Sequence, residues 1–446
     1  MKVAVVGAGW AGLAAAAGLH DAGCQVTVYE AARTAGGRAR RLERPGFDHP
    51  LDNGQHILLG AYTATLALMR RLGRDPDRLL LRHPLHLESA DGAFRLRAPR
   101  LPAPLHLLAA LAGARGLAPG DGRAALRLMR ALRRARWRPP ADWTVQDLLT
   151  RQAQPAGLCR MLWTPLCLAA LNTPPREACA RLFAHVLRDA LAGARPASDL
   201  LLPRTDLGSL WPDAAAGLCD LRLGCAARTL RTAGDGWEID GERYAGAVLA
   251  LPPYAAARLL HGLPAADGGP PLLAALEAFA YQPIATLTLR LAGPWRLPRP
   301  MMMLSEDPQR GHHGQWLFDR AQLAGRDGDG ELAVVASAAG VLHAAGRAAG
   351  AERLAEQVRE QVARHPAALP PMPPVAARAL VIEKRATFAA VPGLARPGAA
   401  TPWPRLALAG DWTDTGYPGV LEGAVRSGAA AARRLAAALS AAAAGA

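Results

Sequence analysis

Apolar strand-like runs and alanine-rich helical sequence alternate at the start of the chain. Lys2–Val6 is a short, β-branched, apolar run of the kind found in buried parallel strands. Helix-favouring, alanine-rich sequence then extends to His20, and a second apolar run, Gln25–Tyr29, follows a turn and ends in Glu30. This alternation predicts an α/β fold that begins with a strand, a helix and a second strand.

The hydrophobic pattern changes character twice further along the chain. It predicts mainly helices between residues 100 and 215, and it returns to an α/β pattern from Cys219. Near the C-terminus we expect a strand at 406–409 and a helix from about Gly419 to Arg434. The other predicted strands are 85–88, 94–97, 221–223, 237–239, 247–251, 284–291, 331–336 and 377–383, and the other predicted helices are 62–72, 121–138, 159–171, 176–191, 351–364 and one that begins at Thr144.

Three glycines follow the first predicted strand in G-x-G-x-x-G spacing. Gly7 allows a tight turn, and Gly9 lets the backbone approach a diphosphate at the positive N-terminus of the following helix. Gly12 lets this helix pack closely on the strand. Glu30 is placed to accept hydrogen bonds from a ribose hydroxyl, and its charge disfavours the 2′-phosphate of NADP. The pattern therefore predicts a dinucleotide site.

A second glycine motif, Gly36-Gly37-Arg38, follows this acid. It suits another backbone approach to phosphate with an added cation, which argues against a turn that binds no ligand. The alternative of a signal peptide starting at Lys2 is disfavoured because glycines interrupt the apolar segment and the strand pattern continues to Glu30.

The C-terminal segment Arg405–Leu435 offers a second helix N-terminus. A strand ends at Gly410-Asp411 and a helix starts near Gly419, so backbone N–H groups and a positive dipole point at one place. Such a terminus stabilises the negative charge that a reduced flavin accumulates, and Asp411 is suited to accept from ribityl or ribose hydroxyls. A packed terminal helix is the alternative for this segment alone. Together with the N-terminal motif it favours FAD over NAD.

Composition narrows the class of protein further. The chain of 446 residues has a net charge of +15, almost entirely from arginine, and 51% hydrophobic residues. No nucleic-acid motif accompanies the charge, and no uninterrupted apolar run reaches transmembrane length after the N-terminal motif. Six scattered cysteines show no zinc spacing and are expected to be reduced, with no metal site. We expect a cytoplasmic protein.

Residues 121–138 are expected to form a basic amphipathic helix. Arg123, Arg127, Arg130 and Arg134 recur at helical spacing, and Trp137 stands at the end. A solvated charged face over an ordinary core is one interpretation. The other is a helix that lies on an anionic membrane surface, on the inner face of the cytoplasmic membrane, and admits an apolar substrate.

Two polar clusters interrupt apolar surroundings. Residues 52–56 crowd Asp, Asn, Gly, Gln and His into one loop, either as an Asx turn that caps the helix at 62–72 or as a group beside the reactive ring of the cofactor. Arg204 and Asp206 are expected either to form an ion pair or to line a substrate cavity.

Several sequence segments resemble a known family. GAGWAGLAAAAGL, GGRA, AVLALPP and LALAGDWTDTGYPGVLEGAVRSG resemble the flavin-containing amine oxidase and phytoene desaturase superfamily. DNGQHILLGAY, LWTPLCLAALNTPP and ASDLLLPRTDLGSLWPDAA are similar to segments of the squalene-associated FAD-dependent desaturases, which act as hydroxysqualene dehydroxylases in bacterial hopanoid pathways. The resemblance covers nearly the whole chain.

The resemblance implies a Rossmann-like FAD-binding domain of the glutathione reductase type with an inserted α+β substrate domain. The FAD-binding domain would comprise residues 1–80, 216–260 and 396–446, with a largely helical, substrate- or membrane-facing region at 81–215 and a substrate-domain sheet with helices at 261–395. The implied FAD-binding residues are Gly7, Ala8, Gly9, Trp10, Ala11, Gly12, Glu30, Arg33, Gly36, Gly37, Arg38, Gly54, Gln55, Ala227, Asp411, Gly419, Val420 and Leu421.

Two of the family's features are altered or missing. Ala227 occupies a position that is usually Val, where only the main chain meets adenine. Lys384 is the only lysine late in the chain, which weakens an amine oxidase assignment because those enzymes use a lysine to bind water.

The implied reaction is reductive removal of an allylic hydroxyl to give squalene. It needs a dry apolar site, reduced FAD and a hydrogen-bond donor for the departing oxygen. His56 and Tyr417 are the candidate catalytic donors, with Asn172 as a further polar candidate. Alternatives are a polyene desaturase of the phytoene or carotenoid type, and a non-catalytic prenyl- or lipid-binding escort on the same fold. Only one dinucleotide fingerprint is visible, so we expect a separate electron donor.

Overall fold

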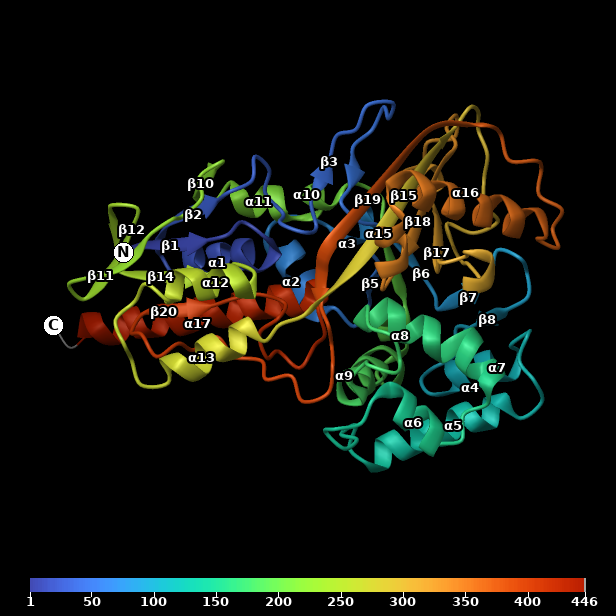
Figure 1. Ribbon diagram of the computed structural model, residues 1–446, viewed down its shortest axis with the longest axis horizontal. Coiled ribbons are helices and arrows are strands. Elements are labelled where there is room, and N and C mark those ends of the chain that lie inside the picture. Colours follow the sequence, from blue (N-terminus) through green and yellow to red (C-terminus); the bar gives the residue numbers. More distant parts are fainter. Residues whose placement is uncertain (445–446) are drawn as a thin grey trace.

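A five-stranded parallel sheet holds the two ends of the chain together in the computed structural model, which describes residues 1–444 (Figure 1). The sheet has the order β10-β2-β1-β14-β20, and each neighbouring pair is parallel. Strands β1, β14 and β20 are almost wholly buried, which suits their continuous apolar sequences. The strand bounds are β1 Lys2–Val6, β2 Gln25–Glu30, β10 Asp220–Leu223, β14 Gly246–Leu249 and β20 Leu406–Leu408.

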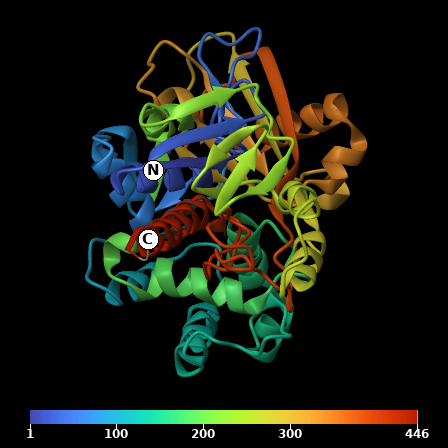
Figure 2. The same ribbon diagram turned by 90° about the vertical axis from the view of Figure 1, so that its left-hand side faces the viewer.

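Helix α1 (Trp10–Asp21) and the C-terminal helix α17 (Leu421–Ala444) pack closely beside this sheet. Figure 2 shows α17, in red, below the strands at the N-terminal end. A Cβ atom on Gly428 would lie 2.2 Å from the carbonyl oxygen of Ala11, so only glycine allows this approach. Helix α17 extends beyond Arg434, where the pattern placed its end, because the following alanines favour helix.

A second, antiparallel sheet forms the other half of the molecule, with the order β16-β17-β18-β15-β19. Its two long strands, β15 and β19, run from the parallel sheet towards the far side of the molecule (Figure 1). Helices α15 (Gly340–Ala345) and α16 (Arg347–Ala363) pack on it. The strand bounds are β15 Tyr281–Leu291, β16 Met301–Met303, β17 Trp316–Asp319, β18 Glu331–Ala336 and β19 Val375–Phe388.

A helical region lies below the second sheet in Figure 1. Two of its segments are π-helical turns, Cys159–Trp163 and Arg188–Ala192. Such turns shift side chains out of the regular α-helical register and are frequent at functional sites. The α-helices are α4 Leu105–Ala112, α5 Asp121–Arg134, α6 Val145–Arg151, α7 Ala156–Leu158, α8 Thr164–Leu171 and α9 Ala180–Leu187.

Two predicted helices of this region were too long. The helix expected at 121–138 ends at Arg134, because Arg136 and Trp137 adopt positive φ angles. The helix expected at 176–191 begins only at Ala180 and turns π-helical at Arg188. The helix start expected at Thr144 is confirmed, and Thr144 and Asp147 form a capping box there.

Shorter elements connect these layers. None of the helices within residues 1–444 is both long and apolar enough to cross a membrane. The remaining strands are β3 Arg41–Leu42, β4 Leu51–Asp52, β5 Leu58–Leu59, β6 Leu80–His83, β7 His86–Glu88, β8 Arg95–Arg97, β9 Leu200–Pro203, β11 Leu230–Ala233, β12 Gly236–Ile239 and β13 Glu242–Tyr244, and the remaining helices are α2 Thr63–Arg71, α3 Pro76–Leu79, α10 Leu207–Leu210, α11 Pro212–Ala216, α12 Pro253–Leu260, α13 Gly269–Glu277 and α14 Arg320–Leu323, with 3-10 turns at Arg195–Ser198 and Pro308–Arg310.

Candidate active site

The first glycine turn places backbone where side chains would block it. Gly7 has a φ of +107°, and a Cβ there would lie 2.5 Å from the carbonyl oxygen of Ala250. A Cβ on Gly12 would lie 1.8 Å from the Gly7 oxygen, so helix α1 can begin against the strand only with glycine at this position. A Cβ on Gly37 would lie 3.0 Å from the Gly9 Cα, so the two glycine motifs touch.

Glu30 fastens the first turn to the loop after β2. Its two carboxylate oxygens accept hydrogen bonds of 2.8 Å from the backbone N–H groups of Ala8 and Ala32. Each oxygen keeps a further lone pair. The carboxylate therefore stands at the edge of the turn and remains able to accept from a bound hydroxyl.

Arg38 links this N-terminal region to the C-terminal segment. Its Nη2 donates to Asp411 Oδ1 at 2.6 Å, and its Nη1 donates to the backbone oxygen of Ala386 at 2.8 Å. Burial lowers the pKa of Arg38, but the adjoining Asp411 carboxylate more than offsets this and the pKa is raised. The pair holds together two segments that lie 373 residues apart in sequence.

These elements enclose a cavity of about 1040 Å³, which we call the larger cavity. It lies at the carboxyl ends of the parallel strands, where such sheets bind ligands. Of the sequence-predicted cofactor residues, those that line it are Gly7, Gly9, Trp10, Ala11, Glu30, Gly36, Gly37, Arg38, Gly54, Gln55, Ala227, Asp411, Gly419, Val420 and Leu421.

Three predicted cofactor residues do not line this cavity. Ala8 contributes only its N–H to Glu30, and Gly12 packs on Gly7. Arg33 is exposed on the loop after β2. Local spacing identifies the turn correctly, but it does not tell which side of the turn each residue faces.

His56 lines the larger cavity, but its ring has no free N–H for the predicted role of donor. Its Nδ1 is 2.8 Å from the backbone oxygen of Gly54. A carbonyl only accepts, so the proton resides on Nδ1 and Nε2 is an acceptor. Burial lowers the pKa of His56, which keeps the ring neutral.

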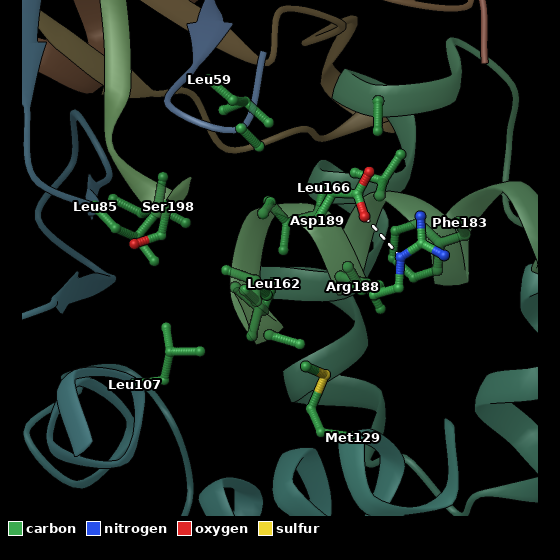
Figure 3. A pocket seen from close by; sticks show the side chains of 18 of the residues that line it. Leu59, Leu85, Leu107, Met129, Leu162, Leu166, Phe183, Arg188, Asp189 and Ser198 are labelled. Atoms are coloured by element: carbon green, nitrogen blue, oxygen red, sulfur yellow. Dashed lines mark hydrogen bonds and ion pairs between the residues drawn. The ribbon is translucent and has the colours of Figure 1, made fainter. Parts of the chain in front are cut away.

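A second cavity of about 690 Å³, the apolar cavity, lies within the helical region. Leucines, alanines and aromatic rings form most of its wall, among them the Leu59, Leu107, Leu162 and Leu166 side chains in Figure 3. Both π-helical turns contribute to this wall, with Leu162 and Trp163 from one and residues 188–192 from the other. The cavity suits a long apolar ligand.

A small polar cluster interrupts this apolar wall. Arg188 Nε donates to Asp189 Oδ1 at 2.7 Å, the interaction dashed in Figure 3, and the Tyr417 hydroxyl donates to Asp189 Oδ2 at 2.7 Å. Although burial opposes ionisation, the hydrogen bonds from Arg188 and Tyr417 hold the pKa of Asp189 below its usual range. Tyr417 thus lines the apolar cavity and not the larger one, and its proton is already committed to a carboxylate.

The two cavities adjoin. Ile57, Tyr62, Ala169, Ala170, Trp316 and Val420 line both of them. Two side chains on the wall of the larger cavity carry buried polar atoms with no partner within residues 1–444, namely the Tyr281 hydroxyl and the Trp316 Nε1. Buried donors are normally satisfied, so these atoms fit a bound polar ligand. Sequence reasoning identified none of Tyr62, Tyr281 and Trp316, because no local motif marks them.

The predicted ion pair of Arg204 with Asp206 is wrong. Asp206 pairs with Arg41, at 3.1 Å from its Nε, and caps α10 through Ser209, so it does not pair with Arg204. Neither Arg204 nor Asp206 lines either cavity.

The loop at 52–56 does not cap α2. Asp52 accepts from the N–H of Leu207 at 3.0 Å, and burial raises its pKa to about 7. The N-terminus of α2 is capped instead by the Glu422 carboxylate of α17.

Asn172 lines the larger cavity, but its side chain serves the structure. It donates to Thr387 Oγ1 at 3.0 Å and accepts from the N–H of Ala338 at 2.6 Å. Among residues 1–444, no group of three or more His, Cys, Asp or Glu side chains is arranged to hold a metal ion, and the six cysteines are free thiols.

Comparisons with known proteins agree with this geometry. The model of the family described as flavin containing amine oxidoreductase matches residues 10–436. A hydroxysqualene dehydroxylase from Rhodopseudomonas palustris is 32% identical over 448 residues, which cover 96% of both proteins. A zeta-carotene desaturase from Zea mays is 33% identical, but over only 24% of this chain and 19% of that protein. The solved structure of cyclohexylamine oxidase from Brevibacterium oxydans shares the fold, with a TM-score of 0.67, 19% identity and coverage of 98% of this chain and 99% of that one.

Proposed function

The chain belongs to the flavin containing amine oxidoreductase family, and from this premise we propose that it removes the hydroxyl of hydroxysqualene reductively to give squalene. The observation that carries the proposal is the full-length similarity to a hydroxysqualene dehydroxylase, together with an apolar cavity that adjoins a dinucleotide-type cavity. The similarity to a carotene desaturase covers a quarter of the chain, so it supports the superfamily rather than a desaturase reaction.

FAD fits the larger cavity. The backbone of the two touching glycine motifs would hold the diphosphate at the N-terminus of α1, and Glu30 would accept from the ribose. Asp411 and the N-terminus of α17 would meet the ribityl chain and the ring, and Ala227 the adenine. The unpartnered Tyr281 hydroxyl and Trp316 Nε1 provide further donors for its polar atoms. When bound and reduced, FAD supplies the hydride.

The apolar cavity would hold the isoprenoid chain. Each methylene group removed from water contributes about 0.8 kcal/mol, so a long hydrocarbon needs no other anchor than this wall. The wall also excludes water from the junction of the two cavities, where the carbon that carries the hydroxyl must lie for hydride transfer. Because the chain shows one dinucleotide fingerprint, we propose that a separate protein or small reductant supplies the electrons.

Peripheral contact with a membrane would bring such a substrate to the cavity. Leu101, Leu105 and Leu108 are exposed, and Leu108 also lines the apolar cavity, so its mouth lies at α4. The apolar side of α5 is buried in the protein core, and its arginines are exposed. Two of them, Arg130 and Arg133, also line the apolar cavity, so these charges would meet an anionic surface where the substrate enters. We propose that α4 and these arginines together contact the cytoplasmic face of the membrane.

The product identifies the reaction. Flavin-loaded protein, reduced without oxygen and given hydroxysqualene, is expected to yield squalene, detected by gas chromatography with mass spectrometry. A polyene desaturase with oxidised flavin would instead oxidise phytoene or squalene. A lipid-binding escort would purify without a flavin spectrum. Either of these last results would overturn the proposal.

A further inference from the structure

Resting on the proposed function, we infer that the Tyr62 hydroxyl is the donor to the departing hydroxyl oxygen of the substrate. Tyr62 immediately precedes α2 and lines both cavities at their junction. Within residues 1–444 its hydroxyl makes no hydrogen bond to protein. A free phenol at the boundary between the hydride source and the apolar chain is where the reaction needs a donor.

The backbone around Tyr62 is held by a buried carboxylate. Glu422 is fully buried and accepts from the N–H groups of Ala64 and Thr65, both at 2.9 Å, and from the Thr65 hydroxyl at 2.7 Å. Arg426 Nε donates to the same carboxylate at 2.9 Å. Because Glu422 directly follows Val420 and Leu421, which line the larger cavity, the cofactor segment and the first turn of α2 are fixed relative to each other. Glu422 is thus a positioning residue for Tyr62.

The other polar groups near the junction are unsuited or already engaged. The Tyr417 proton is given to Asp189, His56 is neutral with its N–H on Gly54, and the Asn172 amide bonds to protein. The Trp316 N–H lacks a partner at the junction, but an indole does not release a proton to a leaving group. The Tyr281 hydroxyl lines only the larger cavity.

The electrostatics keep Tyr62 in the protonated form that a donor requires. Burial, with smaller contributions from Glu422 and Tyr417, raises the pKa of the phenol above its ordinary value. In the reaction the C–O bond breaks with its electron pair on oxygen, which takes the Tyr62 proton and leaves as water. The new C–H bond needs a hydride, which bound and reduced FAD would supply, and solvent would return one proton to Tyr62. The sum is alcohol, one hydride and one proton giving hydrocarbon and water.

Tyr62→Phe and Tyr417→Phe form a matched pair, since each removes one phenol oxygen from the wall of the apolar cavity. Removal of a general acid typically costs about 10² to 10⁴ in rate, so Tyr62→Phe should lower kcat by at least about 100-fold with little change in KM. Tyr417→Phe should lower kcat less than about tenfold. FAD content and melting temperature verify that both variants fold.

Binding provides a second readout that does not depend on turnover. Hydroxysqualene and squalene are titrated into the oxidised, FAD-loaded protein, and the flavin absorbance change is followed. The wild type should prefer the alcohol, and Tyr62→Phe should reduce that preference about two- to tenfold, the value of one hydrogen bond. Tyr417→Phe should preserve it.

A fluorinated tyrosine at position 62 keeps the shape of the side chain and lowers the pKa of its phenol. The alkaline limb of kcat should then move to lower pH, which a structural tyrosine would not cause. Wild-type kcat in Tyr62→Phe, or an unmoved alkaline limb, overturns the role of Tyr62. If the wild type itself forms no squalene, the proposed function fails, while the binding preference still decides whether Tyr62 holds an alcohol.

Discussion

The two cavities are built from opposite kinds of sequence. The larger cavity is lined by glycines, backbone and charged groups from three distant segments, and its best-defined parts are short motifs at the ends of strands. The apolar cavity is lined by leucines, alanines and rings, mostly from helices, and its few charged groups come from α5 and a π-helical turn. If FAD and substrate bind in these cavities as proposed, cofactor binding depends on local backbone geometry, whereas substrate binding depends on how helices pack.

A methyl group added to the first glycine turn should have the largest effect on cofactor binding. In Gly12→Ala the new Cβ would lie 1.8 Å from the Gly7 oxygen, so we expect complete loss of bound FAD, measured as flavin absorbance per protein. Gly157→Ala is the control, because nothing lies within 4 Å of a Cβ there. A Gly12→Ala protein that purifies yellow would show that the turn does not depend on glycine at this position.

Asp52 is a buried carboxyl at the start of the polar loop 52–56, and the rest of this loop lines the larger cavity. Burial raises the pKa of Asp52 from 3.8 to about 7, so the folded state keeps a proton that the unfolded state releases. This contribution to stability is full below pH 3.8 and is lost as pH rises to about 7. Asp52→Asn can still accept from Leu207 and has no charge to bury.

Urea unfolding at pH 5 and pH 8 measures this effect. The variant should gain stability relative to the wild type between these pH values, by at most about 3 kcal/mol, since one pKa unit corresponds to 1.36 kcal/mol. An equal difference between variant and wild type at both pH values would mean that Asp52 is ionised in the folded protein throughout.

The exposed arginines of α5 provide a third test. Arg127→Glu with Arg130→Glu should weaken flotation with anionic vesicles by at least about 2 kcal/mol, roughly thirtyfold, because each arginine near such a surface contributes about 1 kcal/mol. Neutral vesicles should bind neither protein appreciably. Equal flotation of variant and wild type would reject contact through α5.

A single polar side chain in the wall of the apolar cavity should weaken substrate binding and leave FAD binding unchanged. Leu166→Gln places an amide in the wall without a designed partner, which costs about 1–2 kcal/mol and should raise KM roughly tenfold. FAD content should not change. Val341→Gln, at a position 57% exposed, is the control. If Leu166→Gln lost FAD as well, the two cavities would not be separable in function.

More of the larger cavity than of the apolar cavity could be predicted from the sequence. Gly7, Gly9 and Glu30 could be recognised because their roles depend on spacing within one strand–helix unit. Tyr62 and Asp189 could not, because their roles depend on residues more than 200 positions away in sequence. Glu422 holds the first turn of the helix that follows Tyr62, and Tyr417 donates to Asp189.

The errors have the same origin. Arg204 and Asp206 were expected to pair because only one residue separates them in sequence, but Asp206 is the N-cap of α10 and pairs with Arg41. His56 was predicted as a donor without knowledge that the Gly54 carbonyl takes its proton. The basic helix begins where it was predicted but ends at Arg134, and the exposed apolar residues near it belong to α4 and the loop before it.

We propose that hydride passes from FAD in the larger cavity to the substrate in the apolar cavity, and isotope labelling tests this transfer most directly. Flavin-loaded protein is reduced without oxygen in D₂O, where the transferable hydrogen of reduced flavin exchanges with solvent, and is then given hydroxysqualene. We predict squalene with one deuterium on the carbon skeleton, seen by mass spectrometry. Squalene free of deuterium, or no squalene from the reduced protein, would contradict hydride transfer to the substrate at the junction of the cavities.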